Sequence, residues 1–291
     1  MKWREAAALT VAISCFSSCA AGMTGTMPRN GDEARIAAAE SEKNAGDSAV
    51  PSPSQNLPGE AAIPKTSDKK TEKREKTTNQ GPCFHVKTNE KVVALTFDDG
   101  PHPHYTDQIL ALLEQYRAKA TFFVVGKNLE LYGAVAKRVT EAGHEIGNHT
   151  YDHPTLSAIT PGELSGQIEK NEKLIEKLTG GKCLYFRPPE GFCGKYVRDV
   201  IRKKGYQAIL WDVDTRDWAG TPSETIIKNV MKSVHPGSIV LFHDYVGKHN
   251  TTIAALREIL PRLAAEGYRF VTITELLSYG FEGSSAPSAG G

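Results

Sequence analysis

Short apolar runs alternate with amphipathic stretches from residue 91 onward. The runs are rich in β-branched and aromatic residues, which is typical of buried strands, whereas apolar residues at helical spacing indicate helices that pack on a sheet. The runs predict strands over residues 92–97, 121–126, 144–148, 184–187, 207–214, 238–243 and 269–273. The helical spacing predicts helices that include residues 109–116, 168–178, 197–201, 226–231 and 253–263. Glycines expected to end helices include Gly143, Gly180, Gly205 and Gly267.

This alternation predicts one α/β domain over residues 88–280. Strands joined by helices form a parallel sheet with right-handed crossovers. The seven predicted strands indicate a distorted seven-stranded (β/α) barrel, incompletely closed, and a doubly wound open sheet is the alternative. In both folds, functional residues gather at the carboxyl ends of the strands.

The first residues follow a different pattern. Two basic residues precede an apolar stretch and then small residues, so residues 1–25 are predicted to be an export signal. Cys19 lies in a loose match to a bacterial lipoprotein box, in which Phe16 stands where Leu is usual. Lipid attachment at Cys19 and simple cleavage are both open, and Cys15 is a weaker candidate for attachment.

Residues 26–87 are polar and hold few large aliphatic side chains. Such a segment cannot bury enough apolar surface to offset the entropy of ordering, so we predict a disordered linker there. Residues 281–291 are predicted to be a flexible tail. A signal followed by a long tether predicts an exported protein of the cell envelope, either lipid-anchored through Cys19 or secreted.

Composition narrows the range of partners. The chain has 291 residues and a formal net charge of +1, which gives no reason to expect a nucleic-acid partner. No protein partner is evident from the sequence. Cys83, Cys183 and Cys193 lie in or next to the predicted domain. Export permits disulfides, so a bridge between Cys183 and Cys193 and free thiols are both open.

Five polar motifs lie at the ends of predicted strands and together predict one pocket. Carboxylates, imidazoles and a guanidinium at one rim of a sheet suit a divalent metal and acid–base chemistry. The motifs are Thr96-Phe97-Asp98-Asp99-Gly100-Pro101, His149-Thr150-Tyr151-Asp152-His153-Pro154, Arg187-Pro188-Pro189-Glu190-Gly191, Asp214-Thr215-Arg216-Asp217-Trp218 and Leu241-Phe242-His243-Asp244.

The second motif has the spacing of a metal site. His149 and His153 are four residues apart, and one helical turn would place both imidazoles on one face. Two imidazoles and one carboxylate leave open positions on a catalytic zinc or a similar divalent ion. Asp98 or Asp99 can supply the carboxylate, and the other would then be free as a base. Spacing does not decide which aspartate has which role.

The remaining motifs supply charge and a flat apolar surface. The Arg187 guanidinium can hold a free carboxylate by bidentate pairing. His243 emerges from a buried strand at the same rim and is a candidate general acid. Asp214 and Asp217 can orient His243 or Arg187. Trp218 offers a flat wall for a sugar, and a place in the core is its alternative.

In their order and residues, the five motifs resemble those of the polysaccharide deacetylases, the NodB-homology group or carbohydrate esterase family four. The resemblance covers roughly residues 88–280. It implies a distorted seven-stranded barrel and metal-dependent removal of acetyl groups from N-acetylated sugars. It also implies that Asp98 is the catalytic base, and that Asp99, His149 and His153 bind Zn²⁺ or another divalent ion such as Co²⁺.

The resemblance implies the other roles as well. His243 resembles the catalytic acid, with Asp214 or Asp217 as its partner, and Arg187 resembles the residue that braces Asp98. The residues implied to contact substrate are Leu241 and Trp218 in the acetyl pocket and Glu190, whose backbone N–H would stabilise the oxyanion. Many family members have an aromatic residue at the position of Glu190.

The resemblance therefore predicts a deacetylase that releases acetate from N-acetylglucosamine or N-acetylmuramic acid of peptidoglycan, and the N-terminal pattern predicts that it is exported. Some relatives that act on peptidoglycan also lack the aromatic residue. The enzyme alternatives are a chitin or chitooligosaccharide deacetylase, a poly-N-acetylglucosamine deacetylase and an acetylxylan esterase. A non-catalytic glycan-binding lipoprotein is the alternative from a different class, although no metal ligand or base is missing from the motifs.

Overall fold

The computed structural model describes residues 81–245 and 251–280. The predicted export signal, Cys19, residues 26–80 of the predicted linker and the predicted tail lie outside these residues, so those predictions stay predictions. The predicted linker extends too far, because the Cys83 N–H donates to the Ala208 carbonyl and Val86 is buried in the core. Within the described part of the chain, no helix is both long and apolar enough to cross a membrane.

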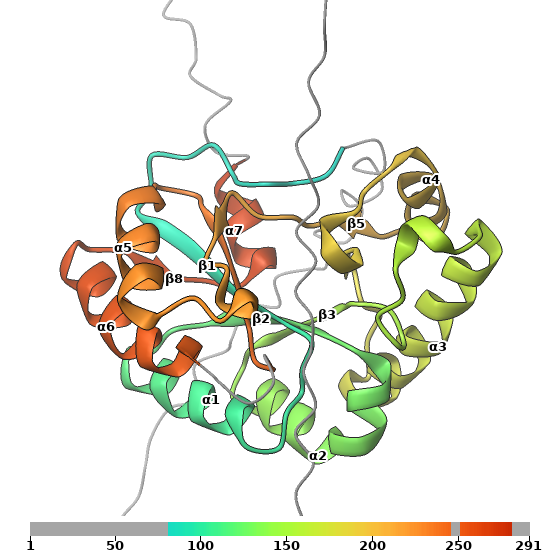
Figure 1. Ribbon diagram of the computed structural model, residues 1–291, viewed down its shortest axis with the longest axis horizontal. Helices are drawn as coiled ribbons and strands as arrows, with labels where there is room; N and C mark the ends of the chain where they lie inside the picture. The colour runs from blue at the N-terminus through green and yellow to red at the C-terminus, as the bar shows by residue number, and fades with distance from the viewer. Residues whose placement is uncertain (1–80, 246–250, 281–291) are drawn as a thin grey trace, which may run out of the picture. The chain divides into compact units, whose positions relative to one another are not determined.

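Parallel strands form the centre of the described part, as the alternation with helices predicts (Figure 1). The strand order is β5-β4-β3-β2-β1-β7-β6, and β8 pairs with the beginning of β1. The strands are β1 (Val92–Asp98), β2 (Ala120–Val124), β3 (Glu145–Asn148), β4 (Tyr185–Phe186), β5 (Gln207–Ala208), β6 (Val213–Asp214), β7 (Ile239–His243) and β8 (Arg269–Phe270).

Helices connect the strands and lie mostly around the outside of the sheet (Figure 1). The α-helices are α1 (Tyr105–Gln115), α2 (Gly126–Glu141), α3 (Pro161–Thr179), α4 (Lys195–Lys203), α5 (Ser223–Ser233), α6 (Thr251–Ala265) and α7 (Ile273–Tyr279). Three short 3-10 helices are η1 (Leu156–Ala158), η2 (Pro189–Gly191) and η3 (Asp217–Ala219).

Two of these helices, α2 and α7, were not predicted as elements. The predicted strand at 121–126 extends too far, because β2 ends at Val124 and α2 begins at Gly126. Helix α2 has a weak apolar signal, since its buried residues are separated by charged ones. The helix end expected at Gly143 is correct, with a positive φ of 77° two residues after Glu141.

The predicted strand at 207–214 is divided in two. Its first part, β5, pairs with β4, and its last part, β6, pairs with β7. Between them, the carbonyls of Ile209 and Leu210 accept hydrogen bonds from the Arg187 side chain instead of from a neighbouring strand. Because β5 and β6 are the two ends of the strand order, this segment carries the chain from one edge of the sheet to the other. The predicted distorted barrel is therefore confirmed.

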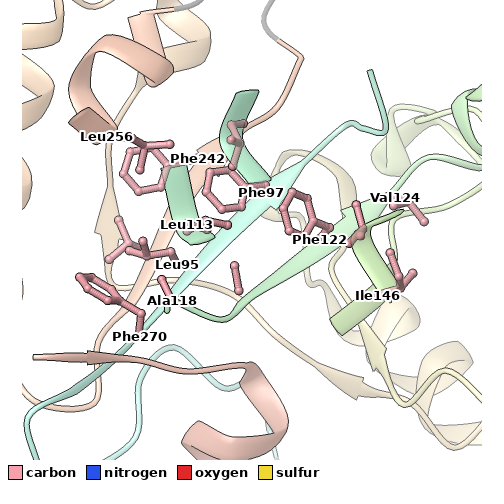
Figure 2. Close-up of a cluster of buried hydrophobic side chains, with 14 of the residues drawn as sticks. Leu95, Phe97, Leu113, Ala118, Phe122, Val124, Ile146, Phe242, Leu256 and Phe270 are labelled. Atoms are coloured by element: carbon pink, nitrogen blue, oxygen red, sulfur yellow. The ribbon is translucent and has the colours of Figure 1, made fainter. Parts of the chain in front are cut away.

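The core packs on both faces of β1, and Figure 2 shows part of the larger of its two clusters. The Phe97 ring stacks on Phe122 of β2 and on Phe242 of β7, with ring centroids 4.9 and 5.7 Å apart. These three rings belong to the larger cluster that packs against the helices. Successive side chains of a strand point to opposite faces, so Thr96 and Asp98 point into the barrel. The alternation of side chains that places Phe97 in the core thus directs the Asp98 carboxylate into the barrel.

The three cysteines of the described part are free thiols, so the bridge considered between Cys183 and Cys193 is not formed. Cys183 is buried, and burial raises the pKa of its thiol to about 12. Thiolate is the reactive form of cysteine, so this side chain is inert at neutral pH.

Candidate metal and catalytic site

Asp98 and Asp99 follow each other but lie in different surroundings. Asp98 is the last residue of β1 and is only 3% exposed. Asp99 has a positive φ of 73°, so the chain turns and the second carboxylate leaves the line of the strand. The next residue must be glycine, because a Cβ at Gly100 would lie 2.1 Å from the Asp244 carboxylate. The turn separates two acids that are adjacent in sequence.

His149 and His153 lie in a loop, so the helical turn predicted for them is wrong. Thr150 and His153 have positive φ angles of 69° and 55°, which an α-helix excludes. The Thr150 N–H donates to Asn148 Oδ1, and the next two N–H groups of the loop donate to Gln167 Oε1. Side chains therefore replace the helical backbone bonds. The two imidazoles still meet, with ring centroids 5.0 Å apart.

Asp99, His149 and His153 together fit a metal ion. One donor atom from each lies within 4.8 Å of the others. Asp99 Oδ1 is 3.6 Å from His149 Nε2 and 3.5 Å from His153 Nε2, and it is buried without a hydrogen-bond partner. An unpaired buried carboxylate oxygen is costly unless a cation meets it. One carboxylate with two imidazoles is a common donor set for catalytic zinc and similar ions.

The orientation of His149 agrees with this use. Its Nδ1 lies 2.7 Å from the backbone oxygen of Arg187, which places the proton on Nδ1 and leaves the lone pair of Nε2 toward Asp99. Burial lowers the pKa of His149, which favours the neutral imidazole that metals bind.

Arg187 is fully buried, and its guanidinium makes four hydrogen bonds. Nη1 donates to Asp98 Oδ1 and to Thr96 Oγ1, both at 2.8 Å. Nε and Nη2 donate to the two carbonyls between β5 and β6. These bonds fix Oδ1 of Asp98. The other oxygen, Oδ2, lies 3.7 Å from His149 Nε2 and faces the metal ligands.

His243 is paired with Asp217. Its Nδ1 lies 2.8 Å from Asp217 Oδ1, and its backbone N–H donates to Asp217 Oδ2. Thr252 of α6 also donates to Oδ2, so the fully buried carboxylate is held from three sides. Burial disfavours the charged imidazole, but the hydrogen bond and charge of Asp217 outweigh it and raise the pKa of His243 to about 9.

The structure does not bring Asp214 to His243. Asp214 is exposed, and its Oδ1 accepts a hydrogen bond from the Arg216 N–H. Trp218 lies in η3 directly after Asp217 and is 55% exposed, so it is not a core residue. Leu241 is buried in β7, opposite Thr96.

Glu190 lies in η2, directly after the two prolines of the third motif. Its side chain is exposed and its φ is 57°, an unusual value for a non-glycine residue. The next residue, Gly191, also has a positive φ, and a Cβ there would lie 2.9 Å from the Trp211 ring. The turn that presents Glu190 is therefore packed on Trp211.

Asn171 of α3 supports the site, although no role was predicted for it. It is fully buried, and its Nδ2 lies 2.8 Å from the carbonyl oxygens of Val124 and Thr150. It ties the histidine loop to the end of β2. A polar residue at helical spacing in the apolar stripe of α3 is the signal that could have indicated it.

Asp244 is a second supporting residue, part of the fifth motif but without a predicted role. Burial raises the pKa of its carboxyl group to about 7. Its Oδ2 accepts a hydrogen bond from Thr106 of α1, and its N–H donates to the Asp98 carbonyl. It joins the ends of β7 and β1 to the start of α1.

Comparison with known proteins agrees with this geometry. A family model described as polysaccharide deacetylase matches residues 85–209. A peptidoglycan-N-acetylglucosamine deacetylase of Bacillus cereus is 44% identical over 198 residues, 67% of this chain and 92% of that protein. A chitooligosaccharide deacetylase of Azorhizobium caulinodans is 34% identical over 200 residues, 65% of this chain and 95% of that protein.

A solved structure extends the similarity to the whole fold. A family 4 acetyl xylan esterase from Clostridium thermocellum, in complex with a cobalt ion, superposes with a TM-score of 0.60 and 34% identity. The match covers 65% of this chain and 91% of that one. The sequence motifs, the fold and these relatives agree, and the chain belongs to the polysaccharide deacetylase family.

Proposed function

We propose that this protein is a metal-dependent hydrolase that removes N-acetyl groups from the N-acetylglucosamine or N-acetylmuramic acid of peptidoglycan and releases acetate. One observation carries the proposal. Three features converge at one rim of the sheet, where Asp98 and His243 are paired in register. They are the Asp98 carboxylate held by Arg187, a cluster that fits a metal ion, and the His243 imidazole held by Asp217.

Asp98 is the proposed base. The Arg187 ion pair holds its carboxylate in a fixed position, with Nη1 2.8 Å from Oδ1. With Oδ1 bound to Arg187, Oδ2 is the oxygen that can take a proton from an attacking water.

Asp99, His149 and His153 are the proposed ligands of a divalent ion, with zinc first and cobalt as the alternative. When bound, such an ion supplies Lewis-acid polarisation of the acetyl carbonyl. The Arg187 carbonyl holds His149 in the tautomer that directs Nε2 to the site.

His243 is the proposed acid. With a pKa of about 9 the imidazole is protonated at neutral pH. Asp217 accepts from Nδ1, which leaves the Nε2 proton for the amine nitrogen as the carbon–nitrogen bond breaks. The amino sugar and acetate are then released.

Three residues complete the proposed substrate site. The backbone N–H of Glu190 is the proposed donor to the developing oxyanion. Trp218 and Leu241 are the proposed walls of the acetyl pocket, and the exposure of Trp218 supports a role in contact with substrate.

The name of the relative from Bacillus cereus supports peptidoglycan as the substrate. We propose that the protein works in the cell envelope, tethered through lipidated Cys19 or released after signal cleavage. The predicted signal and polar linker support this location.

Acetate release by the purified protein tests the function. Peptidoglycan, chitooligosaccharides and acetylxylan would be compared with zinc or cobalt added in turn. We expect release from peptidoglycan that stops with a chelator and returns with metal. Release from acetylxylan alone would contradict the N-deacetylase assignment, and no release from any glycan would favour a glycan-binding protein.

A further inference from the structure

Three aromatic rings form a stack beside the candidate site. The His102 ring lies between Tyr105 and Tyr245, with centroids 4.5 and 5.0 Å away and interplanar angles of 21° and 11°. Tyr132 of α2 lies near the same imidazole, at 6.4 Å. Tyr245 is at the end of this stack and is 44% exposed. One ring of the stack is therefore exposed, and its neighbour His102 is partly buried.

The position of the stack follows from the strand order. His102 follows the turn that ends β1, and Tyr245 comes two residues after His243 at the end of β7. Because β1 and β7 are paired with Asp98 opposite His243, the stack lies at the same rim as the proposed base and acid. Trp218 follows β6, on the other side of β7. Exposed aromatic side chains therefore follow both β7, which carries the proposed acid, and its neighbour β6.

The inner ring of the stack is held rigidly. His102 Nδ1 accepts hydrogen bonds from the N–H groups of His104 and Tyr105, and the His102 N–H donates to Thr106 Oγ1. Thr106 in turn donates to buried Asp244, so these bonds connect the stack to β7. Burial lowers the pKa of His102, in agreement with a neutral ring whose Nδ1 accepts. A ring fixed in this way offers a preorganised surface at low entropic cost.

An exposed tyrosine on a fixed stack suits a pyranose, which presents an apolar face of C–H groups and a polar edge. We propose that Tyr245, supported by His102, is a sugar-binding residue that stacks on a pyranose next to the one whose acetyl group is removed. The inference rests on the proposed function, because it assigns a second sugar subsite to the same glycan. It makes Tyr245 a determinant of preference for polymeric over small substrates.

Kinetics on chitooligosaccharides of increasing length tests this role. In Tyr245→Ala we expect KM for a tetrasaccharide to rise roughly tenfold, as lost aromatic stacking predicts. Hydrolysis of 4-nitrophenyl acetate should be unchanged, since that ester is too small to reach a second subsite. Tyr245→Phe keeps the ring and should behave as the wild type. Tyr268→Ala is the matched control, because this tyrosine precedes β8 at the amino-terminal end of the strands.

The outcomes separate this inference from the proposed function. An unchanged KM for the tetrasaccharide in Tyr245→Ala would overturn the subsite. Equal losses on the tetrasaccharide and on the small ester would also overturn it, because they indicate damage to the fold or to the chemistry. If the wild-type protein released acetate from no glycan while it hydrolysed the ester, the proposed function itself would fail.

Discussion

Asp98 and Asp99 carry the same side chain, but their contacts suit them to different tasks. Asp98 continues the inward direction of the strand and meets a buried guanidinium, whereas the positive φ of Asp99 turns its carboxylate toward two imidazoles. The sequence could not assign these roles, because the direction of a side chain after a turn depends on the backbone angle. For the same reason it left Asp214 and Asp217 undecided as partners of His243.

Replacing Asp98 and His149 separately should distinguish the base from the metal ligands. Asp98→Asn should keep its metal but lose activity by about a hundredfold to ten-thousandfold, the usual contribution of a general base. His149→Ala should lose both its metal and its activity. Acetate release and metal content by elemental mass spectrometry measure the two effects, and full activity in Asp98→Asn would exclude this residue as the base.

The pairing of His243 with Asp217 predicts a change in pH dependence. Asp217 raises the pKa of His243, so the protonated acid persists up to about pH 9. In Asp217→Asn the pKa should fall, and the loss of kcat/KM on the alkaline side should begin at lower pH. Asp214→Asn is the control, because Asp214 is exposed and bonds only locally. Identical alkaline limbs in the wild type and Asp217→Asn would contradict the pairing.

At the scale of elements, buried strands were predictable and the loops between them were not. The strand β1 has seven buried residues and meets its partners in register, so its apolar pattern was a strong signal. The loop from His149 to His153 was predicted as a helical turn from spacing alone. Its conformation depends on Gln167 and Asn171 of α3, and local spacing holds no information on such distant partners.

Asn171 should therefore affect metal binding without touching the metal. Asn171→Ala removes the bonds to Val124 and Thr150, and we expect metal affinity to fall about tenfold to a hundredfold, as for outer partners of metal ligands. Isothermal titration calorimetry with zinc measures the affinity. Lys177→Ala, an exposed change on the same helix, is the control. An unchanged affinity in Asn171→Ala would show that the loop holds its shape without this residue.

At the scale of the whole described domain, the site draws on strands from most of the sheet. The metal cluster takes residues from the ends of β1 and β3, and the proposed acid and its partner come from β7 and η3. A ligand that binds only this assembled arrangement stabilises the folded state by mass action. Metal binding and global stability should therefore be coupled.

Removing the metal should lower the melting temperature. A metal present at a hundred times its Kd adds about 2.7 kcal/mol to the free energy of unfolding. In a domain of this size, each kcal/mol raises Tm by about 2 to 4 °C. We therefore expect a chelator to lower Tm by roughly 5 to 10 °C, measured by circular dichroism. His149→Ala should show no such shift, and a shift of equal size in that variant would place the metal elsewhere.

Arg187 has a consequence for how the protein becomes active. The same guanidinium that holds Asp98 also binds the carbonyls where the chain passes from one edge of the sheet to the other. Arg187 can hold the proposed base only once that passage has formed, so catalysis depends on this tertiary connection and not on secondary structure alone. A newly made chain would be inactive until this passage has formed, and recovery of activity during refolding would report when it forms.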